Sequence, residues 1–247
     1  MQENGPEQEL DLYQELRRNI LSLKLKPGLM LSMSEICETY NRGRTPVRDA
    51  LLQLANDGLL VFLPQRGVMI SKISLKRAES ERFLRKCVEE VVVLESMASC
   101  DIEFITMMEQ SLKRQEKMLE QGDIRQREFM EEDDYFHSVF YRAAGREETY
   151  ELVKAVAKDY YRIRLLSLSE NGIQKRIIDE HRGMADALNS RDANRFRDLF
   201  IKHIHHQIDG EIFLKYTELF EEDKGVQRKS EKLNSDFLVE TKLKYNM

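Results

Sequence analysis

The chain has 247 residues, of which 41% are hydrophobic, with 4 Pro and 11 Gly, a composition typical of ordered, helix-rich domains. No apolar run approaches the roughly 20 residues that span a bilayer, and the first ten residues are too acidic for a signal peptide, so we expect a cytoplasmic protein. Three scattered cysteines, Cys37, Cys87 and Cys100, argue against a disulfide framework and against a zinc ribbon.

The net charge of −5 is distributed unevenly along the chain. Leu12 to Arg77 contains 11 Lys and Arg against 5 Asp and Glu, whereas the first 11 residues contribute −4 and residues 78–247 contribute −7. A basic N-terminal module followed by an acidic body is typical of a DNA-binding head on a separate sensing or assembly domain.

Three short amphipathic helices are predicted in the basic segment. The first covers residues 12–23 and ends before Pro27-Gly28, and the second begins at a capping box of Ser32 and Glu35. The third runs from Thr45, a good N-cap residue, to about Asp57, where a glycine follows.

The third helix has one apolar stripe and one basic side. The stripe consists of Val47, Ala50, Leu51 and Leu54, and Arg44 and Arg48 fall away from it. Two short apolar runs follow at residues 59–63 and 68–71, and they enclose a turn with Arg66 at its tip, which predicts a hairpin. Three helices and a basic-tipped hairpin predict a winged helix-turn-helix whose third helix enters the major groove.

A family resemblance is visible in Pro27-Gly28, Leu31, Arg44-Thr45-Pro46-Val47-Arg48-Asp49-Ala50-Leu51, Leu54, Gly58-Leu59 and Pro64-x-Arg66-Gly67. These residues resemble the N-terminal domain of GntR-family transcriptional regulators over about residues 10–74. The resemblance implies that operator DNA is contacted by Arg44, Thr45, Arg48, Arg66 and Gly67. Two departures are the turn Tyr40-Asn41-Arg42-Gly43, where the family has a Leu-Gly-Val-Ser-like turn, and Met33, where it has an acidic residue.

The rest of the chain reads almost entirely as helix. After a short linker at residues 73–77, helices are predicted over 82–100, 102–120, 124–144, 148–167, 173–189 and 193–215, with no β pattern between them. Such short turns favour an antiparallel bundle. We therefore predict a mainly α protein with a winged helix-turn-helix at residues 8–74 and an all-α effector and dimerisation domain at 78–217. Residues 218–247 form a C-terminal extension, either an added dimerisation helix or a loosely ordered end.

Four polar side chains of the body can converge inside such a bundle. Asp133 and His137 are spaced i, i+4 on one helix face, His181 lies within another helix, and His203 continues the apolar stripe of a third. A carboxylate and three imidazoles can hold a divalent transition metal. Three separate, partly buried histidines are the alternative that the spacing leaves open.

A second resemblance is visible in Asp133-x-x-Phe136-His137, Phe140, Ala143-Ala144-Gly145, and Glu180-His181-Arg182 followed by His203-Ile204. These residues are similar to the FCD effector domain of the FadR-type branch of the same family. The similarity implies a metal held by Asp133, His137, His181 and His203, beside a small organic acid. Arg146 replaces the asparagine that the family has after Ala-Ala-Gly.

The metal and the effector contacts remain open at this point. Four protein ligands complete a tetrahedral zinc site, whereas an octahedral ion such as nickel or manganese keeps two positions for water or a carboxylate. The resemblance suggests Arg85 as an effector-binding residue, and Arg164, on a long predicted helix, is a second candidate for pairing with a carboxylate.

The sequence therefore predicts a homodimeric repressor that binds near-palindromic operator DNA, responds to a small carboxylate, and has no catalytic residues and no membrane contact. Two alternatives remain: a regulator for which the metal itself is the signal, and a metal-dependent enzyme whose four ligands activate water. The sequence offers no convincing general base for the enzyme.

Overall fold

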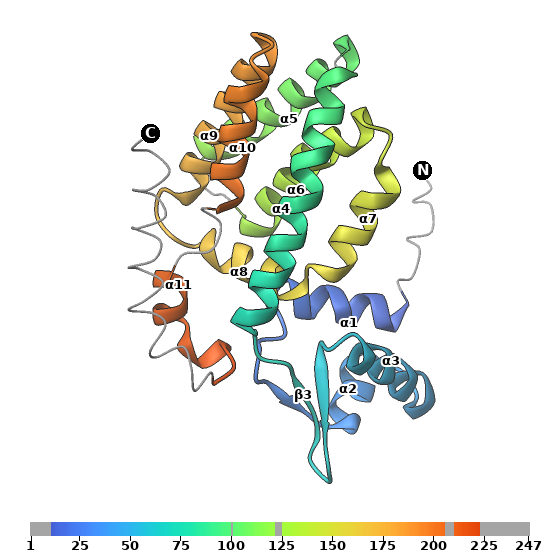
Figure 1. The fold of residues 1–247 in the computed structure, drawn as a ribbon. Helices are drawn as coiled ribbons and strands as arrows, with labels where there is room; N and C mark the ends of the chain where they lie inside the picture. Colours follow the sequence, from blue (N-terminus) through green and yellow to red (C-terminus); the bar gives the residue numbers. More distant parts are fainter. Residues whose placement is uncertain (1–10, 100, 122–124, 206–209, 223–247) are drawn as a thin grey trace, which may run out of the picture.

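The computed structural model describes residues 11–99, 101–121, 125–205 and 210–222, which form a small head beneath a helical body (Figure 1). The head contains α1 (Leu12–Leu21), α2 (Met33–Thr39) and α3 (Arg44–Asn56), with β1 (Met30–Leu31), β2 (Leu60–Leu63) and β3 (Gly67–Ile70). The strands form an antiparallel sheet in the order β1-β3-β2. The winged helix-turn-helix is confirmed. The sequence did not predict β1, because a strand of two residues leaves no recognisable pattern.

Local sequence signals fix the helices of the head. The capping box is present, since the hydroxyl of Ser32 accepts from the main-chain N–H of Glu35 at 3.2 Å and the Glu35 carboxylate accepts from that of Ser32 at 2.7 Å. The predicted stripe of α3 is buried in the core of the head. The prediction of Thr45 as N-cap is wrong, because α3 begins at Arg44 after Gly43. Pro46, which has no N–H, fits the first turn in either register.

The hairpin of β2 and β3, here called the wing, packs closely on β1. Leu60 lies opposite Ile70 and Leu63 opposite Gly67. Gly67 has φ +97°, and a side chain there would collide with the carbonyl oxygen of Leu31. The glycine therefore lets β1 and β3 approach, and it leaves the turn with Arg66 exposed at the end of the wing.

The body is a bundle of eight helices within the described ranges. They are α4 (Leu75–Ala98), α5 (Ile102–Glu120), α6 (Gln126–Ala143), α7 (Glu147–Val156), α8 (Lys158–Ser167), α9 (Ile173–Asn189), α10 (Ala193–His205) and α11 (Gly210–Lys215). Aromatic side chains from α5, α6 and α10 meet in its core, including Phe104, Phe140, Phe196 and Phe200. The all-α body is confirmed, and no helix within the described ranges is both long and apolar enough to cross a bilayer.

Two predicted helices are each two helices in the structure. The helix predicted at 148–167 breaks at Ala157, where ψ is 63°, and α8 then runs with all but two of its residues buried. Alanine is a strong helix former, so the break arises from tertiary packing of α8 and not from a local signal. The helix predicted at 193–215 is divided into α10 and α11, and α4 begins at Leu75 instead of Arg82.

The start of the predicted C-terminal extension packs on the linker. Phe220 is buried, and its segment pairs with Ile73 in a parallel bridge. The main chain of Ile73 donates to Leu219 O and accepts from the N–H of Glu221, both at 2.9 Å. The remainder of the extension, 223–247, lies outside the described residues.

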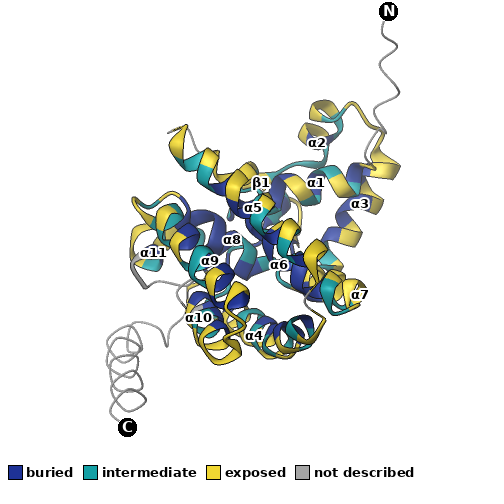
Figure 2. Ribbon diagram, turned by 90° about the horizontal axis from the view of Figure 1, so that it is seen from above, coloured by how far each residue is buried: buried dark blue, intermediate teal, exposed yellow. Residues whose placement is uncertain are grey.

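The outer side of α4 has an exposed apolar stripe, here called the α4 seam, formed by Leu84, Cys87, Val91, Leu94 and Ala98. Val91 is 56% exposed and Leu94 is 45% exposed. The five residues of the α4 seam are spaced alternately three and four positions apart, which is the repeat of a helix that pairs with another helix. Figure 2 shows α4 at an edge of the bundle with its exposed side outward.

Glu81 on α4 lies at the N-terminus of α8, where its carboxylate accepts from the main-chain N–H of Tyr160 at 2.7 Å. Burial raises the pKa of Glu81 from 4.5 to about 7, and the nearby Asp159 carboxylate also raises it. The folded state therefore keeps a proton that the unfolded chain releases above pH 4.5. This stabilisation is complete below that pH and is lost as the pH rises through 7.

We expect the free energy of unfolding in EDTA to fall by about 1–3 kcal/mol between pH 4.5 and pH 8 because of Glu81 alone, allowing for partial solvent screening. Glu81→Gln should remove that part of the pH dependence, and Glu79→Gln, at an exposed position of the same helix, should keep it. Urea unfolding of the three proteins at several pH values measures the effect. An equal pH slope in all three would contradict the assignment.

Candidate metal centre and DNA-binding surface

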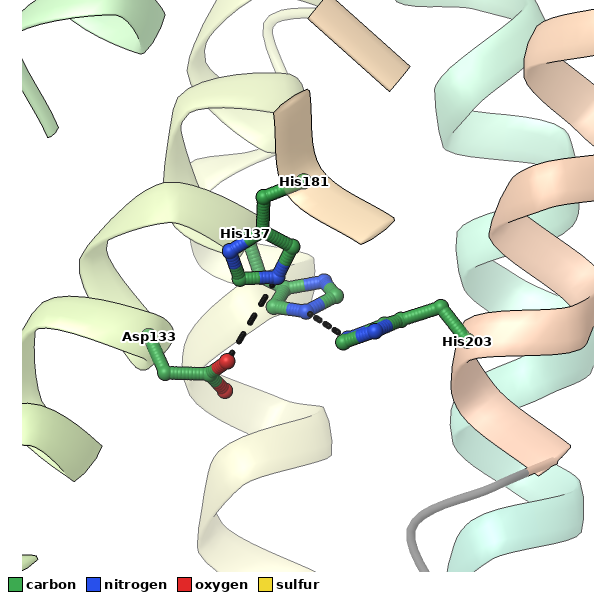
Figure 3. A group of neighbouring side chains, drawn as sticks. All are labelled: Asp133, His137, His181 and His203. Carbon is green, nitrogen blue, oxygen red and sulfur yellow. Dashed lines mark hydrogen bonds and ion pairs between the residues drawn. The ribbon is translucent and has the colours of Figure 1, made fainter. Parts of the chain in front are cut away.

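Three helices bring the predicted metal ligands together. Asp133 and His137 come from α6, His181 from α9 and His203 from α10, and all four are buried. Each contributes a ligand atom that lies within 4.8 Å of the others. Figure 3 shows the four side chains pointing toward one another. The structure thus places in one cluster the residues whose convergence the spacing left open.

The cluster is compact. His137 Nε2 lies 3.2 Å from His203 Nε2, and His181 Nε2 lies 3.5 Å from Asp133 Oδ1. Phe136 stacks on the ring of His181 with 3.9 Å between the centroids, which fixes the plane of that imidazole. The ε nitrogens and one carboxylate oxygen therefore face a common point.

Each histidine also has an oxygen acceptor beside its other ring nitrogen. His181 Nδ1 pairs with Gln115 Oε1 and His203 Nδ1 pairs with Glu180 Oε2, each at 2.8 Å, whereas His137 Nδ1 lies 3.2 Å from Glu89 Oε2 without hydrogen-bond geometry. An acceptor at Nδ1 favours the tautomer with its proton there, and this leaves the lone pair of Nε2 directed at the centre. Sequence reasoning missed all three acceptors. Glu180 is part of the motif Glu180-His181-Arg182, but the sequence did not indicate that it contacts a histidine.

Protonation states in the cluster suit a cation. Burial lowers the pKa of both His137 and His181 well below the ordinary value, so these rings are neutral at pH 7. Burial is the largest single influence on Asp133 and alone would raise its pKa, but Arg164 and the three histidines together hold that pKa below its usual range. An ionised carboxylate beside neutral imidazoles is the state that metal ligands require.

The residues fit a divalent transition metal. Asp133 Oδ1 and His181 Nε2 are buried and have no hydrogen-bond partner among the described residues. Leaving such atoms unsatisfied costs about 1–3 kcal/mol each, and a cation between them would satisfy both. One carboxylate oxygen and three imidazole nitrogens form a donor set that zinc, nickel and manganese accept.

A small pocket adjoins the cluster, with enclosed space for little more than a water molecule. Its polar lining consists of Asp133, Arg164, Ser167, Arg176, Glu180 and His203, and Leu168 and apolar side chains of α6 and α9 complete it. Two members of the cluster thus line a space that also contains arginine side chains. This combination of side chains suits a small anion with an apolar part, provided that the lining moves apart to admit it.

The two predicted effector-binding arginines occupy different places. Arg164 lines the pocket, donates to the carboxylate of Asp133 and donates to Asp134 Oδ1 at 2.9 Å. Arg85 is not among the residues that line the pocket, and it donates to Glu89 Oε1 at 2.8 Å. Arg85 therefore supports the acceptor beside His137, whereas Arg164 is in position to contact a ligand.

The predicted DNA-binding residues lie on the head. Arg44, Thr45 and Arg48 are exposed in the first two turns of α3, and Arg66 is exposed at the turn of the wing. Gly67 is partly buried in β3, where its role is the close approach to β1. The head projects from the end of the bundle, and both α3 and the wing belong to it (Figure 1).

Comparisons with known proteins agree on one family. The model described as "Bacterial regulatory proteins, gntR family" matches residues 8–70, and the FCD domain model matches residues 83–206. An uncharacterized HTH-type transcriptional regulator in an unstable DNA locus of Streptomyces ambofaciens is 30% identical, over 84% of this chain and 86% of its own. The HTH-type transcriptional repressor RspR of Escherichia coli K12 is 27% identical, over 78% and 84%.

Among solved structures, E. coli McbR/YncC has the same fold, with a TM-score of 0.65 at 18% identity over 83% of this chain and 96% of that one. The family models cover both the head and the body. The relatives are transcriptional regulators and not enzymes, which removes the metalloenzyme alternative. This chain belongs to the GntR family of DNA-binding transcriptional regulators, with an FCD domain after its winged helix-turn-helix.

Proposed function

We propose that the protein is a cytoplasmic, homodimeric repressor whose binding to a near-palindromic operator is controlled by a small carboxylate bound beside a divalent metal in the body. The observation that carries the proposal is the buried cluster of Asp133 with three histidines, which adjoins a pocket lined by Arg164. A site built only to stabilise the bundle would not need an anion-binding side chain beside it.

The residues of the pocket have distinct roles in this proposal. Asp133 Oδ1 and the three ε nitrogens hold the metal, Gln115 and Glu180 fix the rings of His181 and His203, and Glu89 lies beside His137. When bound, the metal supplies a positive site for an oxygen of the effector. Arg164 donates to the same carboxylate in a bidentate pair, for which it must loosen its contacts with Asp133 and Asp134.

The head reads DNA with α3 and contacts its backbone with the wing. Arg48 and Arg44, exposed at the start of α3, can reach base edges in the major groove, and Arg66 can pair with a phosphate. Two heads on one operator face half-sites about 34–36 Å apart, which is why the operator should be a near-palindrome.

The α4 seam supports the dimer. An exposed apolar stripe with a 3-4 repeat fits a second copy of itself, as in a two-stranded coiled coil. Both heads must meet the same side of the DNA, so the two-fold axis runs roughly along α4 and the two α4 helices pair in parallel. In that arrangement Cys87 lies opposite the partner's Cys87.

The proposal is tested by titrating DNA from upstream of the protein's own gene with purified protein, by fluorescence anisotropy. The titration is done in EDTA, with zinc, nickel or manganese, and with each metal plus small carboxylates. We expect the operator affinity to change about 5–150-fold when metal and a carboxylate are both present. A full response to metal alone would instead establish the ion as the signal, and no operator binding at low salt would refute the proposal.

The metal ligands are tested by a matched pair of variants. Asp133→Asn should weaken metal affinity at least about 100-fold, because it removes a charged ligand from a buried site. Asp198→Asn, at an exposed position of α10, should leave it unchanged. Competition with a chromophoric chelator measures both affinities, and native mass spectrometry measures the metal content. Equal affinities in the two variants would exclude Asp133 as a ligand.

A further inference from the structure

Helix α8 contacts the head with its first residue and the candidate metal centre near its last turn. It begins at Lys158, directly after the break at Ala157, so its direction is independent of α7. Lys158 and Arg164 are six residues apart, which corresponds to about 9 Å of helix rise. One short helix therefore spans the distance between α3 and Asp133.

Lys158 is attached to the end of α3. Its Nζ donates to the main-chain oxygen of Asp57 at 2.8 Å and lies 3.5 Å from Asp57 Oδ1. Asp57 is the C-cap residue of α3, where free carbonyl groups favour a cation. The same carboxylate accepts from the hydroxyl of Tyr13 on α1 at 2.5 Å. Lys158 therefore contacts the head at the point where α1 and α3 meet.

The next turn of α8 holds the linker. Arg162 is fully buried and donates to the main-chain oxygen of Ser71 at 2.8 Å and to the carboxylate of Asp159. Asp159 also accepts from Arg77 Nε at 2.6 Å and from the main-chain N–H of Ser74 at 3.2 Å. A buried charge network of this kind does not stretch without losing hydrogen bonds, so the linker moves with α8.

We propose that α8 positions the head relative to the body, and that Lys158 is the positioning residue for operator binding. The inference rests on the proposed function, because the carboxylate effector proposed there competes for Arg164. When Arg164 turns from Asp133 and Asp134 toward the effector, α8 shifts as a unit. Lys158 and Arg162 then transmit the shift to α3 and to the linker, and the spacing of the two heads changes.

The test uses three variants of the full chain. Lys158→Met removes the ammonium group and keeps most of the aliphatic stem, and Lys158→Arg keeps a donor. Lys154→Met is the matched control, because Lys154 is exposed on α7 and none of its contacts in the described part of the chain reaches the head. For each protein, anisotropy in EDTA gives the affinity for the whole operator and for a duplex with one half-site. Chelator competition gives the zinc affinity.

We expect Lys158→Met to change the ratio of operator to half-site affinity at least fivefold, since only the ratio depends on how the heads are placed. Half-site affinity, zinc affinity and melting temperature should match the wild type, and Lys158→Arg and Lys154→Met should keep the wild-type ratio. A protein that was merely destabilised would lose both affinities together. A ratio within twofold of wild type in Lys158→Met overturns the proposal.

The outcomes also separate this inference from the proposed function. If the operator affinity of the wild type ignores zinc and carboxylates while Lys158→Met still changes the ratio, effector control fails and the positioning role stands. If the wild type responds to its effector and Lys158→Met responds equally, effector control stands and the route through Lys158 is wrong.

Discussion

Arg48→Ala should weaken operator binding roughly 30-fold to 10⁴-fold per dimer, and it should leave metal content and folding unchanged. Arg48 is exposed on the second turn of α3, opposite the buried stripe that seats the helix. A bidentate arginine–base contact contributes about 1–3 kcal/mol, and the proposed dimer would make it twice. Fluorescence anisotropy at fixed salt measures the loss, because phosphate contacts make every affinity salt-dependent.

Two comparisons make this prediction specific. Arg195→Ala, at an exposed position of α10 in the body, should bind the operator as the wild type does. Arg66→Ala, on the wing, should weaken binding to all DNA sequences alike and reduce the salt slope by about one per contact. If Arg48→Ala retains both its affinity and its preference for the operator, α3 does not read the bases and the proposed DNA contacts are wrong.

The elements that the sequence predicted well are those with local causes. The apolar stripe of α3 and the capping box of α2 depend on residues within a few positions of each other, and both are present. Helices α5 and α9 have their predicted bounds because Gly, Asn, Asp or Ser stands at their ends. Local propensity and short-range capping are sufficient for such features.

The break at Ala157 has no local sequence signal, and it sets the direction of α8 within the body. Without it, residues 158–167 would continue α7 and Arg164 would not reach Asp133. The buried network of Asp159 and Arg162 shows what stabilises the new direction, and its partners in the linker are more than 80 residues away. No window of sequence contains that information.

The candidate metal centre was predictable only in part from spacing. The i, i+4 relation places Asp133 and His137 on one face, but His181 and His203 come from separate helices, and only a family resemblance joined them beforehand. The acceptors Glu89 and Gln115 had no motif at all, because each reaches its histidine across a helix interface. Arg85 donates to Glu89 in the structure, a contact that the sequence did not reveal, and its contact with an effector stays a prediction.

Leu94→Glu should convert the proposed dimer into monomers and weaken operator binding about 10²-fold to 10⁴-fold. In a parallel pair of α4 seams, Leu94 of one chain lies against Leu94 of the other. The variant would therefore bury two like charges without partners. The two heads are then no longer linked, and their combined affinity is lost. Light scattering should show the mass falling from twice the chain mass of 29.2 kDa to that mass. Leu214→Glu, at an exposed position of α11, is the matched control and should remain dimeric.

Cys87 tests the direction of the pairing independently of any charge. In a background of Cys37→Ser and Cys100→Ser, mild oxidation should join two chains through Cys87, because parallel helices bring equal positions of the seam together within disulfide range. An antiparallel pair would set Cys87 against other seam residues and give no covalent dimer. A dimer in solution that does not crosslink would therefore place the two heads at opposite ends of the molecule. Such a dimer cannot hold both half-sites of one operator, and the proposed repressor geometry would be wrong.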